Sequence, residues 1–157
     1  MNIIETDIAE LHRIRFLWEE LNEYNNSLHR KCFGEKLPKD WAHESQDLIK
    51  RAQECRIRFH LARVNKEIVG YCLSSINNDL QGEIISLFVC PEFRDKGIET
   101  CLANKHMKWF CENNVRSIFL YVHPCNCDAI RFYWKFNFFS HSPLMELCEL
   151  SRSCATQ

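Results

Sequence analysis

The turn from Arg94 to Thr100 carries residue types that suit binding of a phosphate group. An apolar segment stops at Pro91, and a helical pattern begins at Gly97. The first turn of a helix leaves backbone N–H groups without partners, and the helix dipole is positive at that end. Gly97 lets the backbone approach a ligand, Arg94 and Lys96 add positive charge, and Thr100 offers a hydroxyl. The turn therefore predicts an anion site, although an ordinary helix start is the alternative.

Hydrophobic patterns place this turn inside a regular order of strands and helices. Apolar residues at helical spacing predict helices over residues 7–25, 40–54, 97–113 and 128–136, with caps at Asp7 and Asp128. Alternating or continuous apolar runs predict strands over residues 1–5, 57–64, 67–76, 83–89, 117–122, 138–139 and 144–147. The run 117–122 is typical of a strand covered on both faces. This order indicates an α/β or α+β fold.

Composition limits the class of protein. The 157 residues suffice for one globular core, and a net charge of -1 argues against a dedicated nucleic-acid binder. No apolar stretch reaches the roughly 18 residues that span a bilayer, and no secretory signal is visible at the N-terminus. We therefore expect a cytoplasmic protein with no nucleic-acid or membrane partner.

Ten cysteines are a high number for this length. No C-x-x-C pair occurs, and the closest spacing, Cys125-Asn-Cys127, fits neither a zinc site nor a thioredoxin motif. Most of the cysteines have apolar neighbours in the sequence. We expect reduced structural thiols and no bound metal.

Two segments together resemble the GNAT superfamily of acyl-CoA-dependent N-acyltransferases. In the first, an apolar strand precedes Arg94-x-x-Gly97-x-Glu99, similar to the family's [QR]-x-x-G-x-[GA]. In the second, the strand 118–122 precedes Asn126-x-x-Ala129-x-x-Phe132-Tyr133-x-Lys135-Phe136-x-Phe138. The resemblance covers about residues 82–139. It implies a mixed, mostly antiparallel sheet of about six to seven strands with helices on both faces. We expect one such domain over residues 1–150, followed by a flexible tail at 151–157.

The resemblance also implies a cofactor site for acetyl-CoA, or coenzyme A, as co-substrate. The amides of Phe88 and Val89 would bind the pantetheine arm, at a place where neighbouring strands of this family splay apart. The pyrophosphate would lie against Arg94, Asp95, Lys96, Gly97, Ile98, Glu99 and Thr100. Asn126 matches a position that contacts the coenzyme arm, with a turn-forming role as the alternative.

The same resemblance assigns an acid and a base. Tyr133 matches the tyrosine that contacts the coenzyme and protonates its leaving thiolate; the alternative is a core tyrosine. A protonated amine must lose a proton before it attacks a thioester, and Glu83 lies where several such enzymes draw a general base. The alternative for Glu83 is a solvated acid at a strand start. Further candidates are Ser86, Tyr121 and His123.

The chain departs from the family pattern at three positions. Glu99 stands where the family has Gly or Ala, and Asp95 stands where Gly is common. Both place negative charge near the expected pyrophosphate, although Glu99 suits the helix dipole. Asn137 replaces a Gly, and Asn tolerates the positive φ of a helix C-terminus.

The sequence thus predicts an N-acetyltransferase that moves an acetyl group from acetyl-CoA to a primary amine of a small molecule or peptide. We expect direct transfer in a ternary complex, by a monomer or a homodimer. The alternative is a degenerate member that binds a ligand or partner without catalysis. Acidic and aromatic residues in the expected acceptor region favour a cationic amine: Trp18, Glu19, Glu20, Glu23, Tyr24, Trp41 and Glu44.

Overall fold

The structure, a computed structural model, describes residues 1–35 and 39–140. These residues form two compact units. The first comprises residues 1–24 and 39–121, and the second comprises residues 25–35 and 122–140. Within the described ranges no helix is both long and apolar enough to cross a membrane. The single domain expected over residues 1–150 stays a prediction.

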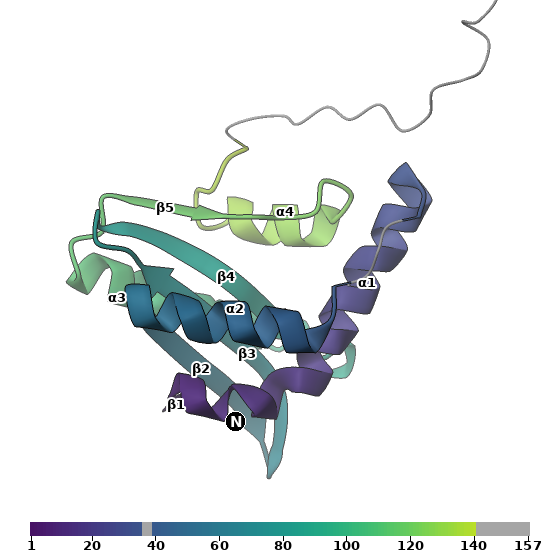
Figure 1. The fold of residues 1–157 in the computed structure, drawn as a ribbon. Coiled ribbons are helices and arrows are strands. Elements are labelled where there is room, and N and C mark those ends of the chain that lie inside the picture. Colours follow the sequence, from purple (N-terminus) through teal and green to yellow (C-terminus); the bar gives the residue numbers. More distant parts are fainter. Residues whose placement is uncertain (36–38, 141–157) are drawn as a thin grey trace, which may run out of the picture. The chain divides into compact units, whose positions relative to one another are not determined.

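A five-stranded sheet forms the centre of the first unit (Figure 1). Its strands, in spatial order, are β1 (Asn2–Thr6), β2 (Arg56–Val64), β3 (Glu67–Ile76), β4 (Gln81–Val89) and β5 (Ser117–Leu120). Neighbouring strands are antiparallel except for β4 and β5, which are parallel. The sheet is therefore mixed and mostly antiparallel, as expected.

The strand count and the environment of the last strand differ from prediction. The described residues form five strands where six to seven were predicted. Residues 138–139 are not a strand, and residues 144–147 lie outside the described part. The expectation that the run 117–122 is covered on both faces is wrong, because exposure alternates along β5 and Phe119 is 40% exposed. In the described sheet β5 is an edge strand, so an apolar run alone did not show burial.

Outside the sheet, the described residues include four α-helices and a 3-10 helix that precedes the first of them. They are η1 (Ile8–Ile14), α1 (Arg15–Phe33), α2 (Trp41–Glu54), α3 (Ile98–Glu112) and α4 (Cys127–Trp134). Asp7 caps its helix as predicted, and Asp40 caps α2; each side chain accepts a backbone N–H. The first helical segment runs on to Phe33 rather than ending near Asn25. The predicted cap of α4 was wrong, because Asn126 and not Asp128 occupies that position.

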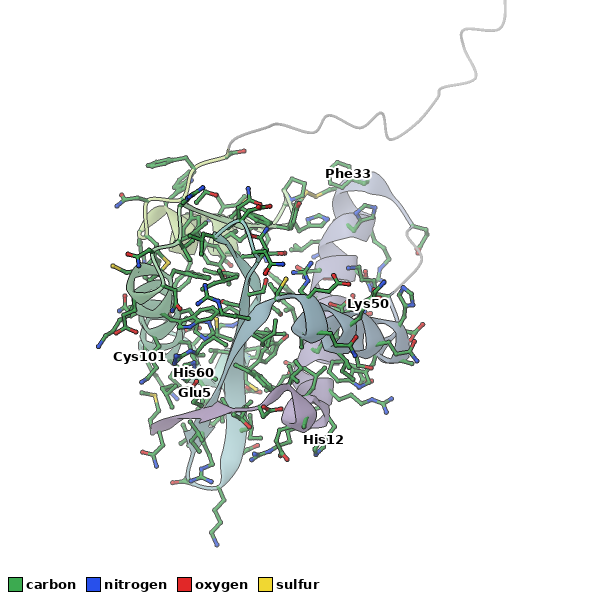
Figure 2. The ribbon with its side chains drawn as sticks, turned by 60° about the vertical axis from the view of Figure 1, so that its left-hand side comes forward. Glu5, His12, Phe33, Lys50, His60 and Cys101 are labelled. Carbon is green, nitrogen blue, oxygen red and sulfur yellow. A yellow bond between two sulfur atoms is a disulfide. The ribbon has the colours of Figure 1, made fainter. Side chains whose placement is uncertain are left out.

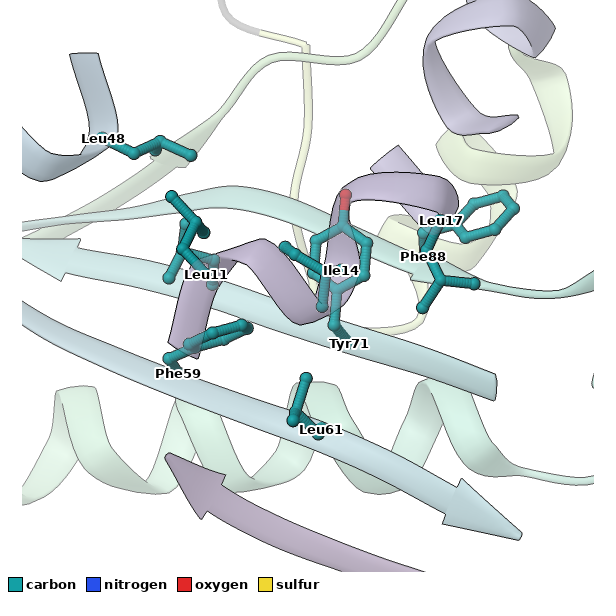
Figure 3. Packing of buried hydrophobic residues seen from close by; sticks show 9 residues of the cluster. Leu11, Ile14, Leu17, Leu48, Phe59, Leu61, Tyr71 and Phe88 are labelled. Atoms are coloured by element: carbon teal, nitrogen blue, oxygen red, sulfur yellow. The ribbon is translucent and has the colours of Figure 1, made fainter. Parts of the chain in front are cut away.

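One face of the sheet is covered by η1, α1 and α2 (Figure 3). Strand alternation points Phe59 and Leu61 of β2 and Tyr71 of β3 to this face, where they meet buried helical residues. The helices contribute Leu11, Ile14, Leu17 and Leu48. Burying large side chains of this kind stabilises the fold by about 1.5–3 kcal/mol each.

The opposite face is covered by α3, so helices lie on both faces as expected. A hydrogen-bonded chain of buried polar groups joins them. His106 of α3 places Nδ1 2.7 Å from Oγ of Ser74 in β3 and Nε2 3.1 Å from Nδ1 of His60 in β2. All three residues are buried, and Glu5 lies beside His60 in Figure 2, with its Oε2 4.0 Å from His60 Nε2. The sequence patterns did not predict these contacts, because the three residues come from three separate elements of the fold.

Burial keeps both imidazoles neutral. It lowers the pKa of His60 from 6.5 to about 4, an effect that Glu5 opposes and that Arg58 and Lys105 reinforce. It lowers the pKa of His106 from 6.5 to about 3, with the neighbouring His60 and Arg58 adding to the shift. Two neutral imidazole rings in hydrogen-bonding contact place no charge in the buried interior.

Candidate functional site

Strand β4 loses its neighbour halfway along its length. The parallel register between β4 and β5 runs from Gln81 opposite Ser117 to Ile84 opposite Leu120. Beyond Ile84, β4 continues to Val89 and pairs only with β3 among the described residues. This stretch, residues 85–89, is called the open edge below. The resemblance found in the sequence places the splay of neighbouring strands at this stretch.

The alternation of the backbone decides which amides face the open edge. The N–H of Cys90 donates to the carbonyl of Val69 in β3 over 2.9 Å. Successive N–H groups of a strand point to opposite sides, so the N–H of Phe88 also points to β3. The N–H groups of Leu87 and Val89 then point to the open edge. Of the two amides expected to bind an arm, Val89 therefore has the suitable direction, while the side chain of Phe88 is buried in the core.

The turn after β4 places a bare helix N-terminus immediately beyond the open edge. A short 3-10 turn, Pro91–Phe93, leads to Asp95 at φ 58° and Gly97 at φ 77°, both in the left-handed region. Gly97 is the N-cap of α3, and in the described part of the chain no side chain caps this end. The N–H groups of Ile98, Glu99 and Thr100 thus have no intrahelical acceptor. These are the N–H groups to which the sequence analysis assigns an anion site.

The two cations of the turn are both turned onto the protein itself. Nε of Arg94 donates to the carbonyl of Val89 over 3.0 Å. Nζ of Lys96 donates to the carbonyl of Glu92 over 2.8 Å and lies 5.0 Å from the ring centre of Phe93. The Arg94 bond fixes the turn against the end of β4, and the Lys96 bond lies within the turn.

Two acidic residues lie in the same turn as these amides. Asp95 is exposed and Glu99 is half-buried in the first turn of α3. Neither forms an ion pair within residues 1–35 and 39–140. The two carboxylates of this turn therefore have no ion-pair partner in the described part of the chain, while the two cations of the same turn are hydrogen-bonded to backbone carbonyls.

Glu83, the expected general base, lies one residue before the strands separate. Its Oε2 accepts a hydrogen bond from Nη1 of Arg51 in α2 at 2.5 Å, and its side chain is 13% exposed. The carboxylate therefore projects to the face that α2 covers. Arg51 is a neighbour that sequence reasoning missed, because 32 residues separate it from Glu83.

The other two candidates in the first unit have different surroundings. Oγ of Ser86 lies 2.7 Å from the phenol oxygen of Tyr71, which is fully buried. Burial raises the pKa of Tyr71 far above its usual range, so the phenol stays protonated. Tyr121 is 85% exposed and packs edge-on to Phe119. Neither contacts Glu83 through any hydrogen bond in the described residues.

In the second unit, the ends of α4 fix two more candidates, Asn126 and Tyr133. Asn126 is buried and its Oδ1 accepts the N–H of Ala129 at 3.1 Å, which is an N-cap. At the other end Asn137 adopts φ 61°, as its sequence position predicts. The N–H of Phe138 donates to the carbonyl of Tyr133, and the two rings lie 5.8 Å apart. This Schellman motif with its hydrophobic contact holds Tyr133, which is 9% exposed.

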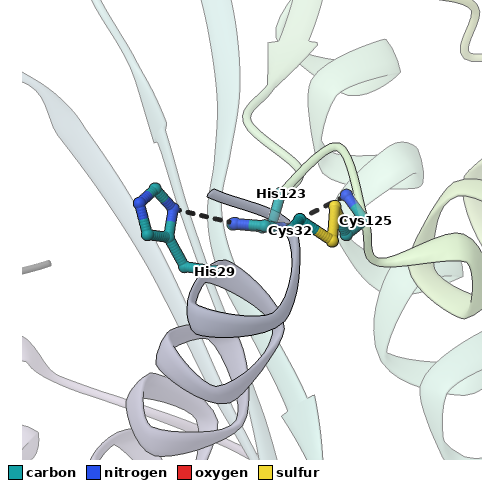
Figure 4. The surroundings of a disulfide bond; sticks show 4 residues. All are labelled: His29, Cys32, His123 and Cys125. Atoms are coloured by element: carbon teal, nitrogen blue, oxygen red, sulfur yellow. Dashed lines mark hydrogen bonds between the residues drawn. A yellow bond between two sulfur atoms is a disulfide. The ribbon is translucent and has the colours of Figure 1, made fainter. Parts of the chain in front are cut away.

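A disulfide joins Cys32 at the end of α1 to Cys125 before α4 (Figure 4). The expectation of reduced thiols is therefore wrong for this pair, because the fold brings together two residues that are 93 positions apart. His123 lies beside it: its Nδ1 accepts the N–H of Cys125 at 3.2 Å, and its Nε2 lies 3.3 Å from Nδ1 of His29. The free thiols among the described residues are Cys55, Cys72, Cys90, Cys101, Cys111 and Cys127.

An open strand edge followed by a bare helix N-terminus suits a long amide-bearing arm that ends in phosphate, and this defines a class of acyl-carrier-dependent transferases. The chain belongs to the acetyltransferase (GNAT) family, whose model matches residues 14–138. The resemblance found in the sequence is thereby confirmed.

Curated relatives carry related names. The N-alpha-acetyltransferase of Saccharolobus solfataricus is 32% identical over 102 residues, covering 57% of this chain and 61% of the relative. N-alpha-acetyltransferase 60 of Xenopus tropicalis is 34% identical over 83 residues, covering 50% of this chain and 34% of the relative. The chain thus spans less than two thirds of the length of each of these relatives.

Solved structures agree on the fold. A mutant of the BH1408 protein from Bacillus halodurans superposes with a TM-score of 0.74 at 17% identity, over 96% of this chain and 100% of that chain. An aminoglycoside N-acetyltransferase in complex with CoA gives a TM-score of 0.65 at 14% identity, over 96% and 100% of the two chains. At these identities the likeness concerns the fold alone.

Proposed function

We propose that the protein is an N-acetyltransferase that moves an acetyl group from acetyl-CoA to a primary amine of a small molecule or peptide. Transfer is direct, within a ternary complex. Family membership supports the proposal. The observation that carries it is the open edge of β4, which leads through one short turn to the uncapped N-terminus of α3.

The two parts of this segment suit the two ends of the donor. The Val89 and Leu87 backbone groups at the open edge can pair with the amides of the pantetheine arm as an added strand would. The amides of Ile98, Glu99 and Thr100 can hold the pyrophosphate at the positive end of the helix dipole. Gly97 leaves open space at this approach, since a Cβ built there meets no atom within 4 Å.

The reaction requires two proton movements. Glu83 accepts a proton from the ammonium group of the acceptor, directly or through water, so that the amine can attack the thioester. Collapse of the tetrahedral intermediate forms the amide and breaks the C–S bond, and the thiolate leaves with a proton from Tyr133. Arg51 binds the Glu83 carboxylate and so fixes its position on the face of the sheet that α2 covers. The role of Tyr133 follows from its motif position alone.

A peptide amine is the favoured acceptor within this proposal. Four of the curated relatives, at 29–34% identity, are named N-alpha-acetyltransferases. Two others, at 33% and 35% identity, are named only as uncharacterized N-acetyltransferases. The aminoglycoside N-acetyltransferases share the fold at 14–16% identity. We therefore rank the α-amine of a peptide above an aminoglycoside amine.

The test is mass spectrometry of acceptor panels incubated with acetyl-CoA. Peptides with free and blocked α-amines are compared with polyamines and aminoglycosides, and Glu83→Gln is the matched variant. Direct detection of the acetylated product avoids thiol reagents, which would react with the exposed Cys101, Cys111 and Cys127. Acetylation of the free α-amine, slowed roughly 100-fold or more by Glu83→Gln, is the expected result. No product with any amine would refute the catalytic proposal.

The acidic turn favours a second candidate, a family member that binds a ligand without turnover. Asp95 and Glu99 oppose an anionic ligand at the helix start, and the two nearby cations are engaged elsewhere. Calorimetric titration with coenzyme A separates the cases. Glu99→Gln removes the charge alone and Glu99→Gly also removes the side chain; each should tighten binding roughly threefold to tenfold if the pocket works. Absence of binding in all three forms would exclude coenzyme A as the ligand.

A further inference from the structure

Arg94 stands at the motif position expected to meet the coenzyme's phosphates, yet the structure uses it inside the first unit. Its Nε donates to the carbonyl of Val89 at 3.0 Å. Its guanidinium lies 5.6 Å from the ring centre of Phe88 and 5.9 Å from that of Tyr24. The side chain is half-buried. Three contacts with the end of β4 and the adjoining helix thus fix one cation.

The bond to Val89 meets a need created by the splayed strands. A strand carbonyl that is withdrawn from water needs a donor, and at Gln81–Ile84 the parallel neighbour β5 is in place to supply one. Val89 lies five residues past Ile84, and its carbonyl points to the same side as its N–H, the open edge. Val89 is 2% exposed. Arg94 therefore replaces the missing strand for this one carbonyl.

This replacement leaves a defined set of groups for a ligand. Because the Val89 carbonyl is occupied, an arm lying along the open edge meets the N–H of Val89 and both backbone groups of Leu87. A ligand that offered only N–H donors to Val89 would find its acceptor taken. The open edge is thus shaped for one amide register rather than for any extended chain.

We propose that Arg94 is a positioning residue, which fixes the end of β4 for the donor's amide-bearing arm, and that it is not a ligand of the donor's phosphates. The inference rests on the proposed function and deepens it. The phosphate end of the donor is then held by the α3 amides alone. Arg94 acts through N–H donation, and its charge is secondary.

Two substitutions separate donation from charge. The side-chain nitrogen of Gln is four bonds from Cα, the same distance along the chain as Nε of Arg, so Arg94→Gln keeps a donor at this place and removes the charge. Arg94→Met keeps the apolar stem and removes both. Lys96→Met is the matched control, since Lys96 is the other cation of the same turn and is exposed.

Two donors separate the arm from the phosphates. Acetyl-CoA is compared with S-acetylpantetheine, which has the arm and thioester without the phosphates. We expect Arg94→Met to raise KM for both donors by the same factor, roughly tenfold, with kcat nearly unchanged. Arg94→Gln should recover most of this loss. Lys96→Met should leave KM for S-acetylpantetheine unchanged.

Every other pattern overturns the proposal. A rise in KM for acetyl-CoA alone, with Arg94→Gln as poor as Arg94→Met, would make Arg94 a phosphate ligand. A fall in kcat with unchanged KM would show a loss of folded protein only, and no effect would show an idle contact. If the wild type acetylates no amine, the proposed function fails separately, and the dissociation constants of coenzyme A and pantetheine decide the role of Arg94 in the same way.

Discussion

Acid should destabilise this protein through the chain of His60, His106 and Ser74. Above pH 6.5 both histidines are neutral in the folded and the unfolded chain, so they add no pH dependence. As the pH falls below 6.5, both histidines bind a proton in the unfolded chain. In the folded chain His60 stays neutral down to about pH 4 and His106 down to about pH 3. Stability is therefore lost between these limits.

The size of the loss follows from the two shifts. At pH 5 the unfolded histidines are almost fully protonated and the folded ones are almost fully neutral. Each site then contributes about 2 kcal/mol, and the pair up to about 4 kcal/mol, relative to pH 8. For a urea slope of about 2 kcal/mol/M, the unfolding midpoint should fall by roughly 2 M.

The assay is urea unfolding followed by circular dichroism at pH 8, 6.5 and 5, with reductant absent. The comparison is a triple variant, Ser74→Ala with His60→Leu and His106→Leu, which replaces all three hydrogen-bonded side chains by apolar ones. The measured quantity is the change in unfolding free energy between pH 8 and pH 5, so the absolute stability of the variant is not needed. His12→Gln, at an exposed histidine, is the control and should behave as the wild type.

The reasoning would be refuted by a triple variant that loses as much stability between pH 8 and pH 5 as the wild type does. A wild type whose unfolding free energy is the same at pH 8 and pH 5 would also refute it. The two buried rings would then bind protons as readily in the folded chain as in the unfolded chain.

Two further predictions concern single contacts. Gly82→Ala places a Cβ 2.8 Å from the ring of Phe110 and 3.1 Å from Val115, so it should destabilise the first unit by about 1–3 kcal/mol in urea unfolding; a change below about 0.5 kcal/mol would mean that the ring gives way. Asn126→Ala should cost about 1 kcal/mol by removing the cap on Ala129, whereas Asn126→Asp should keep that stability; weaker coenzyme A binding by Asn126→Asp alone would then show that the amide group contacts the ligand, and unchanged binding would leave Asn126 a cap only.

The sequence predicted turns and helix ends, because these depend on residues close together in the chain. Pro91 and Gly97 bound the turn after β4, and Asn137 takes the left-handed conformation expected of it. The buried contact between His60 and His106 joins residues 46 positions apart, and only packing of α3 on the sheet reveals it. The same holds for Arg51 and Glu83, since a charged residue on an amphipathic helix does not show which strand it will face.

The continuation of α1 to Phe33 has a similar explanation. The sequence pattern predicted an end near Asn25, where a polar stretch that contains Gly34 begins. The helix instead continues to Phe33, because the first left-handed residue after its start is Gly34, at φ 88°. Polar residues inside the last turns did not prevent the helix, because helix propensity falls little for them.

The bond between Cys32 and Cys125 makes most of the chain a covalent ring. Strands β2 to β5 and helices α2 and α3 all lie between these two residues in the sequence, while β1 lies outside the ring and pairs with β2 from there. A force that pulls on the oxidised chain from both sides of this ring can therefore extend only residues outside the range 32–125. The sheet strands within the ring bear no tension until the sulfur bond breaks, so the oxidised molecule resists pulling and threading through a narrow pore in a way that its unfolding free energy does not measure.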